Sequence, residues 1–246
     1  MLRQFPAALK LYDRALDILP NDPDLMASKA SIYKAQGNLD QAAKSLSQIT
    51  TRTESQSAIR TKVNQLTLER NYDEAIRLLQ ARQAQFHFGS EIDRGLNQVL
   101  LALTQRFAGD TAGSKATAEK ARNTVTVRCK DQPENAFFAN LLSLAFAILG
   151  EKDAAIGEAE RAIKLLPSSK DNLYGPGFEE NLALIQTIFG ENSRAISTLT
   201  RLLQTPYLSP LYGPIPITRA LLRLDPLWDP LRVDPVFQKL CVEDQP

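Results

Sequence analysis

Residues 33–49, YKAQGNLDQAAKSLSQI, carry the pattern that decides the fold. Gly37 separates two helix-like segments; Ala42 follows five positions later and Leu46 four positions after that. Glycine favours the end of a helix because it accepts positive φ without steric cost. A small side chain at Ala42 allows two helices to cross at close range. The stretch therefore predicts two antiparallel helices joined by a short turn at Gly37.

The same frame recurs along most of the chain. The turn markers stand at positions 3, 37, 70, 109, 150 and 190, separated by 34, 33, 39, 41 and 40 residues. The markers are Arg3, Gly37, Arg70, Gly109, Gly150 and Gly190, and a small residue follows each by five positions, namely Ala8, Ala42, Ala75, Ser114, Ala155 and Ala195. Arg70 replaces the usual glycine in its copy, so that turn is expected to be tighter in conformation or more strained.

The first two intervals match the 34-residue period of tetratricopeptide repeats, and the copies resemble that family over about residues 3–204. The resemblance implies an all-α fold, a right-handed superhelical solenoid of antiparallel helix pairs. We expect residues 1–204 to form an array of about five and a half repeats. The positions expected to have structural roles in the turns and helix crossings are Gly37, Ala42, Gly109, Gly150, Ala155, Gly190 and Ala195.

The first copy supplies only the second helix of a repeat. An uncovered apolar face at the end of an array is costly. The sequence is therefore interpreted as a piece of a longer chain, or as one whose first face meets another domain or subunit. The later copies are longer than 34 residues. The extra residues lie either in loops, near residues 89–90, 128–133 and 168–177, or in longer helices.

Residues 205–246 form a proline-rich end that contains the pairs Asp225-Pro226, Asp229-Pro230 and Asp234-Pro235. Proline restricts the residue before it, so each pair marks the start or the break of a helix. Trp228 and Phe237 lie between or after these breaks, and burying such side chains contributes about 1.5–3 kcal/mol each. We therefore predict that this segment caps the last repeat, with a short helix beginning at Asp234.

The end of the chain, LLRLDPLWDPLRVDPVFQKL after PYLSP, also resembles the end of tetratricopeptide regions in large bacterial signalling proteins. This resemblance implies an alternative function, that of a C-terminal regulatory or sensory region attached to a Ser/Thr kinase, a nucleotide cyclase or a transcriptional regulator. An upstream domain in the same polypeptide would then be a partner of the repeats.

Composition limits the classes of partner. The formal net charge of +1 provides no overall field that would attract nucleic acid. A basic stretch at residues 115–130 is either a solvated helix face or a local binding patch, and the first is favoured. The most apolar run, residues 136–150, is shorter than the ~20 residues that span a bilayer, which favours a buried helix over membrane insertion.

Two cysteines, Cys129 and Cys241, lie far apart in the sequence and match no metal-ligand spacing. They are typical of a reducing compartment, and the charged, amphipathic first residues lack the apolar region of a signal peptide. These features predict a cytoplasmic protein, with the location left open for a fragment of a membrane-spanning parent. No metal or cofactor is expected.

Catalytic signatures are missing from the sequence. It contains no glycine-rich phosphate loop, no HRD or DFG segment and no G-x-S-x-G elbow. The paired acids at residues 158 and 160, and at 179 and 180, have no identified neighbour that would shift their pKa values. The sequence is therefore interpreted as that of a non-catalytic protein, in which an unrecognised active site is the least favoured hypothesis.

The family resemblance instead implies a scaffold that binds a protein or peptide segment in a concave groove lined by the first helix of each repeat. Positions five and nine of each first helix are expected to face that groove. The polar candidates for partner contact are Ser31, Lys34, Arg60, Asn64, Asn140 and Glu180. Only Arg60 and Asn64 resemble the carboxylate clamp of some family members, so a complete clamp is not expected.

Overall fold

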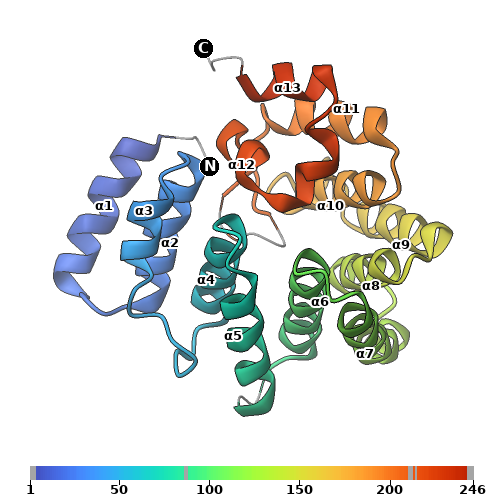
Figure 1. Ribbon diagram of the computed structural model, residues 1–246, viewed down its shortest axis with the longest axis horizontal. Helices are drawn as coiled ribbons and strands as arrows, with labels where there is room; N and C mark the ends of the chain where they lie inside the picture. The colour runs from blue at the N-terminus through green and yellow to red at the C-terminus, as the bar shows by residue number, and fades with distance from the viewer. Residues whose placement is uncertain (1–3, 86–87, 210–212, 214, 243–246) are drawn as a thin grey trace.

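The computed structural model describes residues 4–85, 88–209, 213 and 215–242 (Figure 1). Within these ranges the regular structure is helical, and an isolated bridge joins Ser209 to Gly213. The all-α solenoid predicted from the sequence is confirmed. Arg3, the marker of the first copy, lies outside the described residues.

The helices follow one another as antiparallel pairs along an arc (Figure 1). The first are α1 (Phe5–Ile18), α2 (Pro23–Ala35), α3 (Leu39–Ser45), α4 (Gln56–Leu68) and α5 (Tyr72–Gln85). The central ones are α6 (Glu91–Phe107), α7 (Thr111–Asp131), α8 (Ala136–Leu149) and α9 (Lys152–Leu165). The last are α10 (Gly175–Ile188), α11 (Asn192–Leu202), α12 (Arg219–Leu224), the 3₁₀ helix η1 (Pro226–Leu231) and α13 (Pro235–Val242).

The turn inside each pair uses the left-handed backbone region. Gly37 has φ of 80° and Gly190 has φ of 76°, and the glycines of the two intervening turns are similar. Among the described residues, Arg70 (φ 60°) is the non-glycine that adopts positive φ. A side chain in this conformation costs about 1–2 kcal/mol. The strain expected at Arg70 is therefore present in the backbone.

Fully buried small side chains lie at the points where the helices cross. Ala42, Ala75, Ala118, Ala155 and Ala195 all have zero exposed surface. Without a bulky side chain at these points, the second helix of a pair can approach the first closely, and larger neighbours fill the space around the contact.

The extra length of the later copies lies in both of the expected places. Helix α6 has 17 residues and α7 has 21, compared with 13 in α2 and in α4. In the following copy the additional residues form the loop between Leu165 and Gly175. The apolar run at residues 136–150 forms α8, most of whose side chains are buried. No described helix is both long and apolar enough to cross a membrane.

The core consists of one large apolar cluster and two smaller ones. The N-terminal cluster is formed mainly by α2 to α5, with Leu100 and Leu101 of α6 beside it. The large C-terminal cluster extends from α6 to α13 and also includes Ala35 and Leu68 of the first pairs. The third cluster lies between α8, α9 and α10. The first helices form a row in which α4 and α6 contact one another much less than α2 contacts α4 or α6 contacts α8.

We call residues 205–242 the C-terminal segment. Its Trp228 and Phe237 are 1% exposed and belong to the large cluster, and η1 and α13 pack on α10 and α11. The carboxylate of Asp234 accepts hydrogen bonds from the backbone amides of Val236 and Phe237, which begins α13 at the expected place. The segment also returns to the first pairs, because α12 packs against α2 (Figure 1). The sequence had placed this segment only on the last repeat.

Candidate functional site

The groove candidates lie on the row of first helices, but most of them are buried. Their exposed fractions are Ser31 0%, Lys34 0%, Asn64 7%, Asn140 2% and Glu180 2%, whereas Arg60 is half-buried. The sequence pattern predicted an open groove, and the structure corrects this prediction. A local pattern cannot show that residues more than 100 positions later will lie over the same surface.

Lys34 is the most deeply buried of the candidate cations. Its ammonium group donates to Oδ1 of Asn64 at 2.7 Å and to the carbonyl oxygen of Thr61 at 3.2 Å. The pKa of Lys34 is lowered to about 7, chiefly by burial and also by the nearby Arg60, while Asp225 partly opposes both effects. A lysine whose pKa is near neutral can exist without charge in this environment.

Two carboxyl groups are buried beneath or within the C-terminal segment. Burial raises the pKa of Glu180 to about 8, and the nearby Tyr207 and Ser209 oppose the shift by less. Burial also raises the pKa of Asp225 to about 7, against the hydrogen bond that it accepts from the backbone amide of Leu227. Protonation at neutral pH removes the cost of burying an unpaired negative charge.

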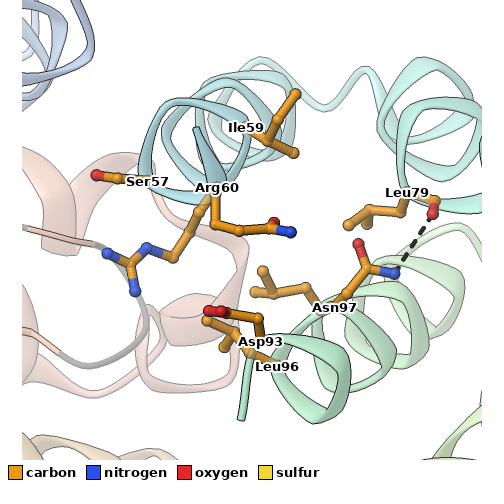
Figure 2. A pocket seen from close by; sticks show the side chains of 9 residues that line it. Ser57, Ile59, Arg60, Leu79, Asp93, Leu96 and Asn97 are labelled. Carbon is orange, nitrogen blue, oxygen red and sulfur yellow. Dashed lines mark hydrogen bonds between the residues drawn. The ribbon is translucent and has the colours of Figure 1, made fainter. Parts of the chain in front are cut away.

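The cleft between α4 and α6 consists of two adjoining cavities, and the larger one also reaches α8 and Leu208, Ser209 and Gly213 of the C-terminal segment. One has a volume of about 200 Å³ and the other about 300 Å³. The residues that line both are Ser57, Arg60, Asp93 and Leu96. Figure 2 shows these four with Ile59, Leu79 and Asn97 around the smaller cavity. The cleft lies where the row of first helices is least tightly packed, because α4 and α6 hardly contact one another.

Apolar side chains line much of the cleft. Leu96 and Leu100 contribute apolar surface to the smaller cavity, and Phe137 and Leu141 contribute it to the larger one. The side chain of Asn97 donates to the carbonyl oxygen of Leu79 at 3.4 Å, which fixes its orientation.

Electrostatics and unmet hydrogen-bonding capacity mark the polar side of the cleft. Burial lowers the pKa of Arg60, and Asp93 opposes the shift. Within the described residues, Nε2 of Gln56 and Oδ1 of Asn140 are buried without a hydrogen-bond partner. Buried groups of this kind are normally satisfied, so the two atoms leave hydrogen-bonding capacity unused beside the cleft.

Of the six groove candidates, the structure brings Arg60 and Asn140 to the cleft and places Ser31, Lys34, Asn64 and Glu180 elsewhere on the row. Sequence reasoning missed Ser57, Asp93 and Tyr174. In the repeat frame Val99 is position five, so a first helix of standard length would begin near residue 95, whereas α6 begins at Glu91. Asp93 therefore lies on an added turn, and the long interval from 70 to 109 was the signal for it.

The basic stretch and the two cysteines singled out in the sequence do not form a binding site. The basic stretch lies on α7, where Arg122 pairs with Glu151 at 3.2 Å and Arg128 with Asp131 at 3.3 Å at the surface. Cys129 is half-buried and Cys241 is buried, and neither forms a disulfide. A search of the described residues finds no group of acidic, histidine and cysteine side chains that could hold a metal ion.

Comparison with known proteins finds a likeness to one repeat family. The tetratricopeptide repeat family model matches residues 2–66. No curated protein matches the chain. Similar solved structures include a thermophilic TPR protein of Thermus thermophilus, which is 18% identical with a TM-score of 0.49, over 75% of this chain and 91% of that one. The resemblance to tetratricopeptide repeats is confirmed for residues 2–66, and the later helix pairs continue the same all-α, tetratricopeptide-like solenoid.

Proposed function

We propose that this chain is a non-catalytic protein-interaction scaffold that binds an extended peptide segment in the cleft between α4 and α6. The observation that carries the proposal is the pair of adjoining cavities on the concave face, where the row of first helices is least tightly packed. Tetratricopeptide-like arrays present such concave surfaces to partner segments.

The size of the cleft favours part of a peptide over a whole metabolite. Small-molecule sites usually enclose about 300–1,000 Å³, and the two cavities have volumes of about 200 and 300 Å³. Each can hold one large side chain. The apolar floor at Leu96 and Leu100 suits an aliphatic or aromatic anchor.

The polar lining suits the flanking peptide backbone. Gln56 and Asn140 provide an unpaired donor and an unpaired acceptor, and Ser57 adds a hydroxyl group. Because Arg60 and Asp93 have opposite charges, the lining has no net formal charge. We therefore expect ligands of mixed polarity, without a run of acidic or basic residues.

A second candidate function is that of a regulatory region in a larger bacterial signalling enzyme. Leu11, Ile18 and Leu19 support it, because they are 63%, 78% and 55% exposed on or next to α1. Exposed apolar surface of this kind is typical of a contact with another domain or subunit. Reading the coding sequence ahead of residue 1 tests this alternative, since a kinase, cyclase or regulator domain should be encoded there.

Selection from a phage-displayed library of random linear peptides, with the folded full chain as bait, tests the scaffold proposal. Selected peptides are then titrated by fluorescence anisotropy against the wild type, Leu96→Trp, Arg60→Met and the control Lys115→Ala, whose side chain is exposed on α7. The tryptophan fills the cleft, so we expect affinity to fall at least about ten-fold, which corresponds to about 1.4 kcal/mol.

Arg60→Met should weaken binding in the same direction, and Lys115→Ala should leave it unchanged. Circular dichroism confirms that each variant is folded. Peptides that bind the wild type and both cleft variants equally would show that the binding surface lies elsewhere. A selection that yields no specific peptide would also count against the proposal.

A further inference from the structure

The C-terminal segment contacts corresponding positions in two successive repeats. At the first turn, a Cβ built on Gly37 would lie 3.3 Å from Cβ of Ala220, and the hydroxyl of Thr218 donates to the carbonyl oxygen of Ala35 at 2.8 Å. At the next turn, the side chain of Arg70 reaches Asp229. The segment therefore follows the turns of the first two complete helix pairs.

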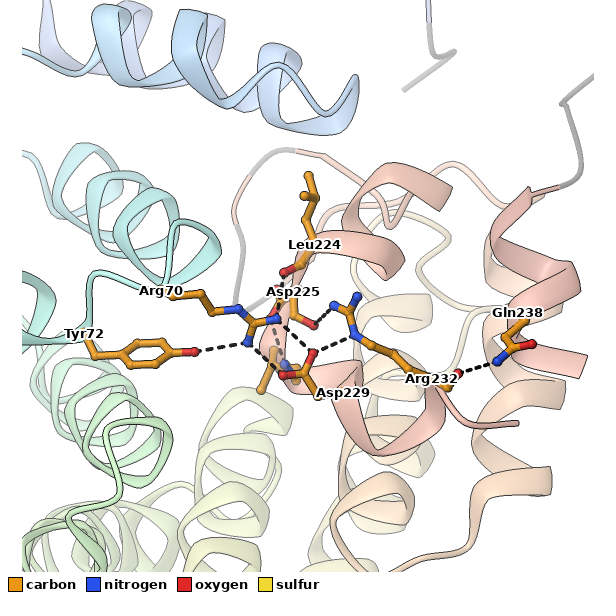
Figure 3. A network of polar contacts seen from close by, with 8 residues as sticks. Arg70, Tyr72, Leu224, Asp225, Asp229, Arg232 and Gln238 are labelled. Atoms are coloured by element: carbon orange, nitrogen blue, oxygen red, sulfur yellow. Dashed lines mark hydrogen bonds and ion pairs between the residues drawn. The ribbon is translucent and has the colours of Figure 1, made fainter. Parts of the chain in front are cut away.

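Arg70 forms the centre of the second contact (Figure 3). Its two terminal nitrogens donate to the two carboxylate oxygens of Asp229 at 2.8 and 2.9 Å. One of them also donates to the hydroxyl of Tyr72 at 3.1 Å, and Asp229 accepts a further bond from Arg232 at 2.7 Å. This two-pronged geometry orients the partners more strictly than a single contact would. It occurs at the turn where a glycine would be less strained.

The two halves of the molecule meet along the cleft. Helices α2 to α5 form most of the N-terminal apolar cluster, while α6 onward and the C-terminal segment form most of the large one, which Ala35 and Leu68 also join. On one side the halves are joined by the packing of α5 on α6, where the rings of Tyr72 and Phe107 lie 5.9 Å apart. On the other side they are joined by the contacts of the C-terminal segment with the first two turns.

The anchoring of the C-terminal segment is unequal. Trp228, Leu231 and Phe237 are buried in the large cluster, so the segment is held firmly to the C-terminal half. Its contact with Arg70 is by contrast polar and open to solvent, since the side chains of Arg70 and Asp229 are 40% and 43% exposed. Partly exposed ion pairs are weak and are screened by salt.

We propose that these contacts, Arg70 with Asp229 and Ala35 with Thr218, form a clasp that holds the two halves together, and that opening of the clasp widens the cleft between α4 and α6. The packing of α5 on α6 is the hinge of this motion. The link between opening and ligand access rests on the proposed function of the cleft, whereas the clasp itself does not.

Two variants test the clasp without a large expected effect on the overall stability of the fold. Arg70→Gly deletes the contact and also relieves the positive φ, so it leaves the turn itself favourable. Asp229→Asn removes the charge and keeps the shape. The matched control is Glu151→Gln, which removes the surface ion pair with Arg122 on the far repeats.

The first readout is the distance between spin labels on Asp40 of α3 and Val236 of α13, both exposed, in a background with Cys129→Ser and Cys241→Ala. The clasp predicts a longer or broader distance distribution in Arg70→Gly and Asp229→Asn than in the background or in Glu151→Gln. Raising the salt concentration to about 0.5 M should shift the background protein in the same direction.

The second readout is native-state hydrogen exchange of the full chain without labels. Amides of α12 should exchange about ten-fold faster in both clasp variants, while those of α8 and α9 should keep their wild-type rates. Unchanged distances and unchanged α12 exchange in both variants would overturn the clasp.

The clasp and the proposed function fail in different ways. If Arg70→Gly and Asp229→Asn open the molecule but the selection yields no specific peptide, peptide binding in the cleft is refuted and the clasp is retained. The opposite result is also possible. If peptide binding requires Leu96 and Arg60 while Arg70→Gly and Asp229→Asn keep the background distance distribution, the clasp is refuted and the binding site is retained.

Discussion

The ammonium nitrogen of Lys34 on α2 lies 2.7 Å from Oδ1 of Asn64 on α4, and neither side chain is more than 7% exposed. Both positions belong to the row of first helices that the repeat pattern assigns to an open groove. In the structure this row supports the chain's own C-terminal segment. The buried ionisable groups on it give the stability of the protein a dependence on pH that can be measured.

Lys34→Met should remove a destabilisation that diminishes as pH rises. The pKa of Lys34 is about 7 in the folded chain and near 10.5 when exposed, so between these values the unfolded state binds more protons. The free energy of unfolding of the wild type should therefore rise with pH in this window, by at most about 1.4 kcal/mol per pH unit from this group. Urea denaturation of both proteins between about pH 7 and about pH 10 measures the difference. Parallel pH profiles would show that Lys34 is solvated in the folded state.

Glu180→Gln should produce the opposite dependence. The pKa of Glu180 is about 8 in the folded chain against 4.5 when exposed, so here the folded state binds more protons. The wild type should lose stability as pH rises through this interval, and the glutamine variant should avoid that loss. The gap in unfolding free energy should therefore widen in favour of the variant from about pH 5 to about pH 8.

Glu134→Gln, at an exposed carboxylate, is the control for this measurement. Its unfolding free energy should follow the wild type at each pH. A gap between the wild type and Glu180→Gln that is the same at every pH would mean that Glu180 is charged throughout and is paired in a way the structure does not contain.

Alanine at two turn glycines should separate backbone strain from packing. Gly37 and Gly190 have similar φ, so Gly37→Ala and Gly190→Ala should each lose about 1–2 kcal/mol from the conformation alone. The added methyl group at position 37 also meets Ala220, whereas at position 190 it meets nothing within 4 Å. Urea denaturation should therefore show a larger loss for Gly37→Ala. Equal losses of unfolding free energy in the two variants would contradict the close contact between Gly37 and Ala220 of α12.

Trp228→Ala should lower the free energy of unfolding by about 3–5 kcal/mol, because it empties a large buried volume. Val233→Ala, at a side chain that is 83% exposed, should change it by less than about 0.5 kcal/mol. Peptide affinity for the cleft should be largely retained by Trp228→Ala when the comparison is made at matched folded fraction. Because Leu208, Ser209 and Gly213 of the C-terminal segment line the larger cavity, a parallel loss of affinity would indicate that the packing of Trp228 holds this lining in place.

The repeat frame could be derived from sequence because each pair is a local unit. A turn residue, a small residue five positions later and apolar spacing between them define the pair, and all lie within about 34 residues. Even the exception was visible, since an arginine at position 70 must adopt a conformation that favours glycine. The short helix beginning after Asp234 was predictable for the same reason, because its cap is adjacent to it.

The buried groove positions could not be derived in this way. Arg70 and Asp229 are 159 positions apart, and no local pattern relates them. Lys34 and Glu180 look like groove residues from their repeat positions. In the structure Lys34 is buried against Asn64, and Glu180 lies beside Tyr207 of the C-terminal segment, which the repeat positions do not show. The cleft had a weaker signal, the added turn of α6 that carries Asp93.

The return of the C-terminal segment to the first turns has a consequence for how the protein unfolds. An open row of repeats is stabilised by neighbours only, so it can fray from either end in small steps. Here fraying of the first pairs must also break their contacts with a segment whose tryptophan belongs to the opposite half. Loss of either end is thereby coupled to loss of the other, and the array should melt as a single cooperative unit.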